Sequence, residues 1–159
     1  VKKTSNFHNR VSFVAFYMEA LNRNGKFQNA ESYGDNFLRA YSKEVLRYRW
    51  HLFFSVYLEA LILQESYGKV IKTAQKYRLL QRDKKYERNA NYQATIPLMV
   101  GLARYKEVQI NQAEFVELLH QHTNQKPGSE RDALLRQLLL NIKEWEPELS
   151  PALRKILEA

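Results

Sequence analysis

The sequence predicts an all-α protein built from tandem antiparallel helical hairpins. Apolar side chains recur at helical spacing along almost the whole chain, as in Phe13, Phe16 and Tyr17. Glycine (5) and proline (4) are scarce in 159 residues, whereas a β-rich fold needs many turns. A six-residue motif also recurs, as FYMEAL at 16–21 and as VYLEAL at 56–61. Together these observations favour stacked helices over any sheet-containing fold.

Breaks in the apolar spacing define the first two hairpins. The first covers about 11–41, and its turn falls at Gly25 because glycine suits the left-handed position after a helix. Ser42 is the expected N-cap of the following helix. The second hairpin therefore covers about 43–81, with a turn near 64–68.

A third hairpin and a C-terminal tail follow. The hairpin covers about 92–122, with Asn111 as the expected cap of its second helix. The tail, 129–159, carries a dense row of leucines and begins after a polar loop. We expect it to form a pair of helices that cap the repeat region 1–122, or that pair with a second chain as a dimer. The whole is expected to be one domain, and the N-terminal Val leaves open that it is a piece of a longer chain.

A shift of 40 residues aligns the first two hairpins. It pairs 16–21 with 56–61, and it also pairs Phe27 with Tyr67 and Phe37 with Tyr77. Repeats of this size are typical of stacked helical units that cannot bury their apolar faces alone. A simple helical bundle with a chance repeat is the alternative.

The order of helix, short turn, aromatic residue, smaller apolar residue and helix resembles the tetratricopeptide (TPR) repeat. The resemblance covers roughly 11–120 and implies a TPR-like α-solenoid that binds a protein or peptide on a concave surface. The sequence departs from the family because its period is near 40 instead of 34, and because Glu65 stands where the first unit has Gly25. No proline closes either unit.

Composition excludes several classes of function. With no cysteine, the chain has neither disulfides nor a thiol nucleophile, and we expect a cytoplasmic location. No stretch is long and apolar enough to predict a membrane span. Phosphate-binding and nucleophile motifs rich in glycine are absent, so no catalytic residue and no cofactor is predicted. His120 and His122 are two residues apart and point to different faces of a helix, so no metal site is predicted either.

Two equivalent glutamates are candidate ligand contacts. Glu19 and Glu59 occupy the same place in the two copies of the repeated motif, beside Tyr17 and Tyr57. These four residues form a candidate peptide groove that would hold a basic ligand. The alternative is that both carboxylates are solvated or paired within the molecule.

Basic residues are concentrated before residue 107. Residues 1–106 hold 19 Lys/Arg against 8 Asp/Glu, whereas 107–159 hold 6 against 9. The densest segment is a candidate patch for an anionic ligand, consisting of Lys69, Lys72, Lys76, Arg78, Arg82, Lys84, Lys85 and Arg88. The first three share one helix face, and a continuous positive surface could form with basic residues of the preceding unit, namely Arg39, Lys43, Arg47 and Arg49. The alternative is that this basic face is only solvated.

The sequence therefore predicts a binding scaffold and not an enzyme. The first hypothesis is a helical-repeat domain that recognises a protein or peptide, such as the sensing or docking part of a regulator. The second is a basic helical protein that binds RNA or DNA backbone, for example within a ribonucleoprotein complex. Salt dependence would separate the two hypotheses.

Overall fold

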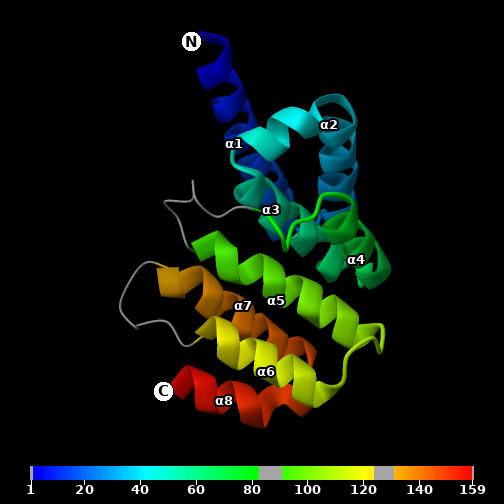
Figure 1. The fold of residues 1–159 in the computed structure, drawn as a ribbon, viewed down its shortest axis with the longest axis vertical. Helices are drawn as coiled ribbons and strands as arrows, with labels where there is room; N and C mark the ends of the chain where they lie inside the picture. Colours follow the sequence, from blue (N-terminus) through cyan, green and yellow to red (C-terminus); the bar gives the residue numbers. More distant parts are fainter. Residues whose placement is uncertain (1, 83–90, 124–130, 159) are drawn as a thin grey trace. The chain divides into compact units, whose positions relative to one another are not determined.

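Most of the described part of the chain is helical (Figure 1). The computed structural model describes residues 2–82, 91–123 and 131–158, and their side chains from 6–82, 95–123 and 136–158. Every regular element in these ranges is a helix, which confirms the predicted all-α class. The chain divides into two compact units, 1–79 and 80–159, and each is described by itself.

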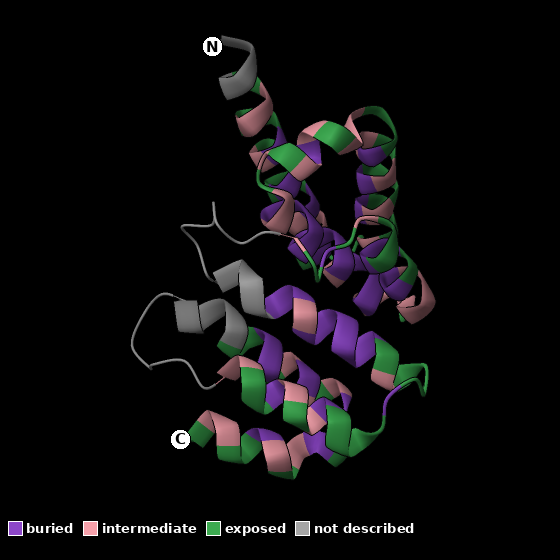
Figure 2. Ribbon diagram, viewed as in Figure 1, coloured by how far each residue is buried: buried purple, intermediate pink, exposed green. Residues whose placement is uncertain are grey.

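The first unit contains two helical hairpins. Its helices are α1 (Lys2–Arg23), α2 (Phe27–Arg47), α3 (Trp50–Leu63) and α4 (Tyr67–Lys76). Helix α3 contacts the other three helices and is buried at ten positions between Leu52 and Ile62 (Figure 2). A helix that is apolar on all sides belongs in a core, and α3 is the central helix of this unit.

Helix α2 extends further than the sequence indicates. It runs to Arg47 and is kinked at Tyr41, whose φ of −137° and ψ of 31° are not helical. Ser42 therefore lies inside α2 instead of capping the next helix, and α3 begins only at Trp50. The break in the apolar pattern near Tyr41 marks this kink and not the end of the helix.

The two hairpins turn in the same way. The amide of Lys26 donates to the carbonyl of Leu21 at 2.8 Å, and the amide of Ser66 donates to the carbonyl of Leu61 at 2.8 Å. These bonds, one 40-residue shift apart, close a Schellman motif around a residue in the left-handed conformation. That residue is Gly25 in one turn and Glu65, with φ 59°, in the other. The first two hairpins thus share their turn geometry at the predicted period.

Two more helices end in the same motif, each with a residue other than glycine in the left-handed position. Arg78 (φ 50°) follows α4, and Val108 (φ 58°) follows α5 (Asn91–Lys106). At the second of these turns the amide of Gln109 donates to the carbonyl of Arg104 at 2.8 Å. A left-handed conformation costs an L-residue about 1–2 kcal/mol, and most for a β-branched side chain such as Val108.

Gly34 lets three helices of the first unit approach closely. A Cβ atom at this position of α2 would lie 2.6 Å from Cδ2 of Tyr57 on α3 and 3.0 Å from Sδ of Met18 on α1. Both neighbours are fully or almost fully buried. The absence of a side chain at Gly34 therefore sets the spacing of α1, α2 and α3.

The described residues of the second unit form four α-helices and a short 3-10 helix. These are α5, α6 (Gln112–Thr123), α7 (Arg131–Trp145), the 3-10 helix η1 (Pro147–Leu149) and α8 (Ser150–Glu158). Pro97 lies inside α5. The cap predicted for α6 is confirmed, since Asn111 Oδ1 accepts from the amide of Glu114 at 2.8 Å and Glu114 Oε1 accepts from the amide of Asn111 at 3.3 Å.

The leucine-rich helix of the tail packs within this unit. Helix α7 contacts α5 and α8, and its Leu138, Leu139 and Ile142 are buried. Lys106 Nζ at the end of α5 pairs with the buried Glu146 at 2.7 Å. The third predicted hairpin and the predicted capping helices thus belong to one compact unit. None of the helices in the described ranges combines the length and apolarity needed for a membrane span.

Candidate functional site: a cationic groove between α2 and α4

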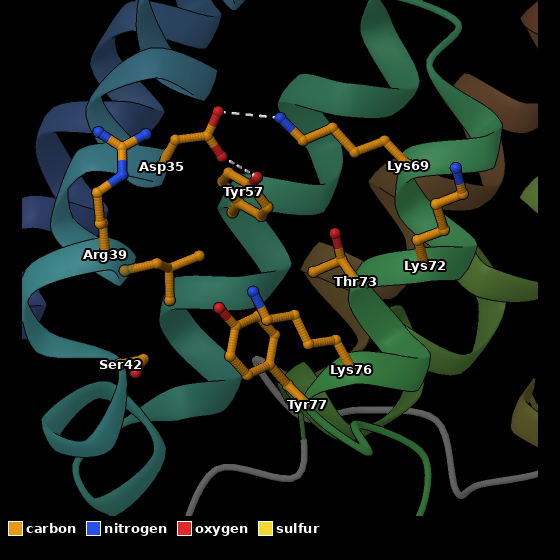
Figure 3. Close-up of a pocket in the computed structure, with 10 residues that line it drawn as sticks. Asp35, Arg39, Ser42, Tyr57, Lys69, Lys72, Thr73, Lys76 and Tyr77 are labelled. Atoms are coloured by element: carbon orange, nitrogen blue, oxygen red, sulfur yellow. Dashed lines mark hydrogen bonds and ion pairs between the residues drawn. The ribbon is translucent and has the colours of Figure 1, made fainter.

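A groove of about 590 Å³ lies in the first unit, with α2 and α4 as its walls and α3 as its floor (Figure 3). Its volume is within the range of ligand-binding clefts. The residues that line it are Asp35, Leu38, Arg39, Ser42, Tyr57, Lys69, Lys72, Thr73, Lys76 and Tyr77. Because α2 belongs to the first hairpin and α4 to the second, the groove exists only through the stacking of the two.

One end of the groove is closed by a charge network. Lys69 Nζ on α4 lies 2.8 Å from Glu31 Oε2 and 2.9 Å from Asp35 Oδ2, both on α2. The second oxygen of Asp35 accepts a short hydrogen bond from the hydroxyl of Tyr57 on α3. Figure 3 shows both partners meeting at the Asp35 carboxylate. The network ties α2, α3 and α4 together and neutralises Lys69.

Protonation states in this network follow from burial and pairing. Burial raises the pKa of Tyr57 far above its ordinary value, and the hydrogen bond to Asp35 raises it further, so the phenol stays protonated and donates. Partial burial by itself lowers the pKa of Lys69, but its bonds to Glu31 and Asp35 outweigh this and the net pKa is raised. Lys69 therefore stays charged at neutral pH.

The other end of the groove carries positive charge that no carboxylate of the described residues neutralises. Arg39 lies on the α2 wall and Lys72 and Lys76 on the α4 wall. Among the described residues that line the groove, Asp35 is the sole carboxylate, and Lys69 and Tyr57 already bind it. All three cations are exposed. This end can therefore accept an anionic group from solution.

Neutral side chains complete the cationic end. Ser42 and Thr73 bring hydroxyls to the groove, and Lys76 Nζ lies 5.3 Å from the ring centroid of Tyr77. Cations, hydroxyls and aromatic rings together suit a ligand that carries carboxylate or phosphate groups on a partly apolar frame. The arrangement supplies recognition by charge and shape.

Of the four residues of the predicted peptide groove, Tyr57 alone is among those that line the groove between α2 and α4. Tyr57 is buried in the floor of the groove just described, whereas Tyr17 is 45% exposed on α1 and contacts Tyr33, with the ring centroids 4.8 Å apart. Glu19 pairs with Arg23 one turn along the same helix, at 2.6 Å. Glu59 accepts from Asn22 Nδ2 at 3.4 Å. Burial, and then the charge of Glu19, raises the pKa of Glu59.

The predicted anionic-ligand patch is brought together in part. Lys72 and Lys76 share the groove with Arg39, as expected from their common helix face. Lys69 lines the same groove but is paired with α2 carboxylates. Arg78 is exposed in the turn after α4, and Arg82 belongs to the second unit. Lys84, Lys85 and Arg88 lie outside the described residues.

The acidic partners of Lys69 were not predicted. Glu31, Asp35 and Arg39 are spaced four residues apart and therefore form one column of charges along α2. That spacing could have indicated the pairing, because a column on α2 that faces α4, the equivalent helix of the second hairpin, would meet Lys69, Lys72 and Lys76. The order along the column, with two acids followed by a base, determines at which end of the groove Lys69 is neutralised and at which end the positive charge remains.

The histidine pair that was considered as a metal site lies on α6. The described residues contain no group of three His, Asp or Glu side chains that could share a metal ion. His120 is exposed and His122 half-buried on α6. Comparison of the chain with family models, with curated proteins and with solved structures finds no match.

Proposed function

We propose that this protein is a helical-hairpin binding scaffold that receives an acidic segment of a partner protein in the groove between α2 and α4. The observation that carries the proposal is the cluster of Arg39, Lys72 and Lys76, three exposed cations around one hollow that no described carboxylate neutralises. Cations held together on rigid helices attract acidic ligands and need little rearrangement to bind them.

The side chains that line the groove favour a protein segment as the ligand. Its floor and walls include the apolar surface of Leu38, Tyr57 and Tyr77 beside the charged groups. Interfaces of moderate affinity combine aromatic anchors with a polar rim in this way. The stacked hairpins with a common turn are the reason to keep the TPR-like α-solenoid as the proposed family of architecture, and a docking role in a regulator as the proposed context. The cytoplasmic location remains a prediction.

A second candidate is binding to the phosphate backbone of RNA or DNA. It is favoured by three exposed basic residues of α2, namely Arg39, Lys43 and Arg47, spaced four residues apart. The kink at Tyr41 interrupts this row, however, and Asp35 would repel a backbone that followed the groove. A nucleic acid carries a charge on every nucleotide, so it favours a longer uninterrupted basic track.

The test measures binding of three fluorescein-labelled probes by anisotropy: an oligoglutamate peptide, an oligolysine peptide and a single-stranded RNA. We expect the acidic peptide to bind and the basic one not to bind. Replacing Arg39, Lys72 and Lys76 together by glutamine should weaken the acidic peptide about tenfold, which corresponds to about 1.4 kcal/mol. The matched control replaces three exposed cations elsewhere by glutamine, namely Lys26, Arg154 and Lys155. It removes the same charge and should have little effect on binding of the acidic peptide.

The outcomes separate the two candidates. If the RNA binds more tightly than the peptide, and its affinity falls steeply between 50 and 200 mM salt, the nucleic-acid function replaces the one proposed. If the groove and control variants lose affinity equally, the attraction is a property of net charge and the groove is not the site.

A further inference from the structure

The outer face of α1 exposes large aromatic side chains in a row. This face consists of Phe13, Phe16, Tyr17 and Ala20, which fall at steps of three, one and three and so lie along one side of the helix. The side chains of Phe13, Phe16 and Tyr17 are 67%, 54% and 45% exposed. Monomeric proteins seldom leave adjacent aromatic residues uncovered unless the patch has a partner.

The internal repeat allows the outer face of α1 to be compared with the equivalent face of α3. At the 40-residue shift the outer face corresponds to Phe53, Val56, Tyr57 and Ala60 of α3. The first three of these are only 0%, 8% and 1% exposed. The same helix face is therefore covered in the second hairpin and uncovered in the first.

The cover on α3 comes from the hairpin that precedes it. The ring of Phe53 lies 6.0 Å from that of Phe37 on α2, and Tyr57 donates to Asp35, also on α2. Tyr57 also occupies the space that the missing side chain of Gly34 leaves. Helix α2 thus covers α3 through a small residue, a carboxylate and an aromatic residue.

We propose that the outer face of α1 is a docking surface for a helical hairpin of the same kind, supplied by a partner and packed as α1 and α2 pack on α3. The second helix of that hairpin presents a small residue opposite Tyr17, a carboxylate that accepts from the Tyr17 hydroxyl, and an aromatic residue opposite Phe13. A second copy of this chain cannot offer α2 for this purpose, because its own Tyr57 and Phe53 already fill those positions.

This inference does not depend on the ligand of the groove between α2 and α4. It does predict that a docked hairpin would form a second groove of the same construction, with α1 as its floor. In that groove Tyr17 takes the place that Tyr57 has in the first, and Tyr33 takes the place of Thr73, because each lies 40 residues before its counterpart.

The experiment supplies the missing hairpin within one chain. Residues 1–49 are joined directly to residues 10–159, so that an added α1–α2 hairpin precedes the original α1 at the natural spacing. Because the protein has no cysteine, Phe16→Cys in the original α1 gives a single thiol on the outer face. The rate of its reaction with a soluble disulfide reagent is compared in the original and the extended chain.

We expect the thiol at position 16 to react at least about tenfold more slowly in the extended chain, because a buried group reacts only through local opening. The matched control adds Gly34→Ala to the first hairpin alone, where the new methyl group would collide with Tyr17 of the original α1. That variant should react as fast as the original chain. A thiol placed on α8 by Arg154→Cys should react equally in all three.

Three results would overturn the inference. One is undiminished reaction of position 16 in the extended chain, whether or not the added residues are helical. Another is slow reaction in the original chain that depends on its own concentration, which would mean that a second copy covers the face. The third is protection of the original chain by phosphatidylcholine vesicles, which would make a lipid surface the occupant.

Discussion

Gly34 allows a sharp test of how the first unit is packed. In a helix, replacing glycine by alanine normally stabilises the folded state by about 1 kcal/mol, because alanine has the higher helix propensity. At Gly34 the added Cβ would lie 2.6 Å from Tyr57 and 3.0 Å from Met18. We expect Gly34→Ala to destabilise the unit in spite of the gain in propensity.

The magnitude follows from how little the neighbours can move. The Tyr57 ring stacks on Phe53 with centroids 5.9 Å apart, and its hydroxyl is bonded to Asp35, so the ring cannot withdraw without breaking a contact. Overpacking a core by one methyl group costs typically 1–3 kcal/mol. A distance of 2.6 Å places the cost in the upper half of that range, about 2–3 kcal/mol. After the propensity gain of about 1 kcal/mol a net loss of about 1–2 kcal/mol remains, and each kcal/mol lowers the Tm of a unit of this size by about 4–8 °C.

The assay is urea unfolding followed by tryptophan fluorescence in a Trp145→Phe background, in which Trp50 reports on the first unit alone. Gly68→Ala is the matched control, because a Cβ at Gly68 in α4 would meet nothing within 4 Å. We expect that variant to gain about 0.5 kcal/mol. If Gly34→Ala is as stable as Gly68→Ala, the close approach of the three helices at Gly34 is refuted.

Three further predictions concern a turn, a hydrogen bond and a half-buried histidine. Val108→Gly should stabilise the second unit by about 1 kcal/mol, since glycine relieves the left-handed strain; an unchanged urea midpoint would contradict this. Tyr57→Phe should cost about 1–2 kcal/mol by removing the hydrogen bond to Asp35, while a loss below about 0.3 kcal/mol would show that bond to be unimportant. Burial, and then the charge of Arg49, lowers the pKa of His51 to about 4. The unfolded chain then binds a proton near pH 6.5 that the folded chain does not, so the free energy of unfolding should fall as the pH drops from about 6.5 towards 4. His51→Gln should remove about 2 kcal/mol of that loss, allowing for the partial exposure of the side chain. If the free energy of unfolding of both proteins varies with pH in the same way, His51 is not the group responsible.

The helical class and the repeat could be predicted because both depend on the spacing of apolar residues along the sequence. The 16–21 and 56–61 motifs place equivalent residues in two hairpins, and the turns at Gly25 and Glu65 have the same hydrogen bonds one repeat apart. The replacement of glycine by Glu65 made the second turn less certain from sequence. Its backbone shows that the contacts around a turn can hold a non-glycine residue in the left-handed conformation.

The environment of each repeated residue could not be predicted in the same way. Tyr17 and Tyr57 have the same local sequence, yet one is exposed and the other buried, because burial depends on whether a neighbouring hairpin is present. The charge of Lys69 is likewise neutralised by Glu31 and Asp35, which are more than 30 residues away in sequence. Helical spacing correctly placed Lys72 and Lys76 on one face, but only the fold shows which cations remain available.

The charge column of α2 gives the groove a direction. Its acidic end lies at Glu31 and Asp35 and its positive end at Arg39, so the groove is electrically asymmetric along its length. A segment whose acidic residues are clustered at one end would be oriented with those acids at Arg39 and away from Asp35. Binding in this groove would then depend on how the acids are distributed along the ligand as well as on its total charge, so a peptide with clustered acids would bind more tightly than one of the same composition with its acids spread evenly.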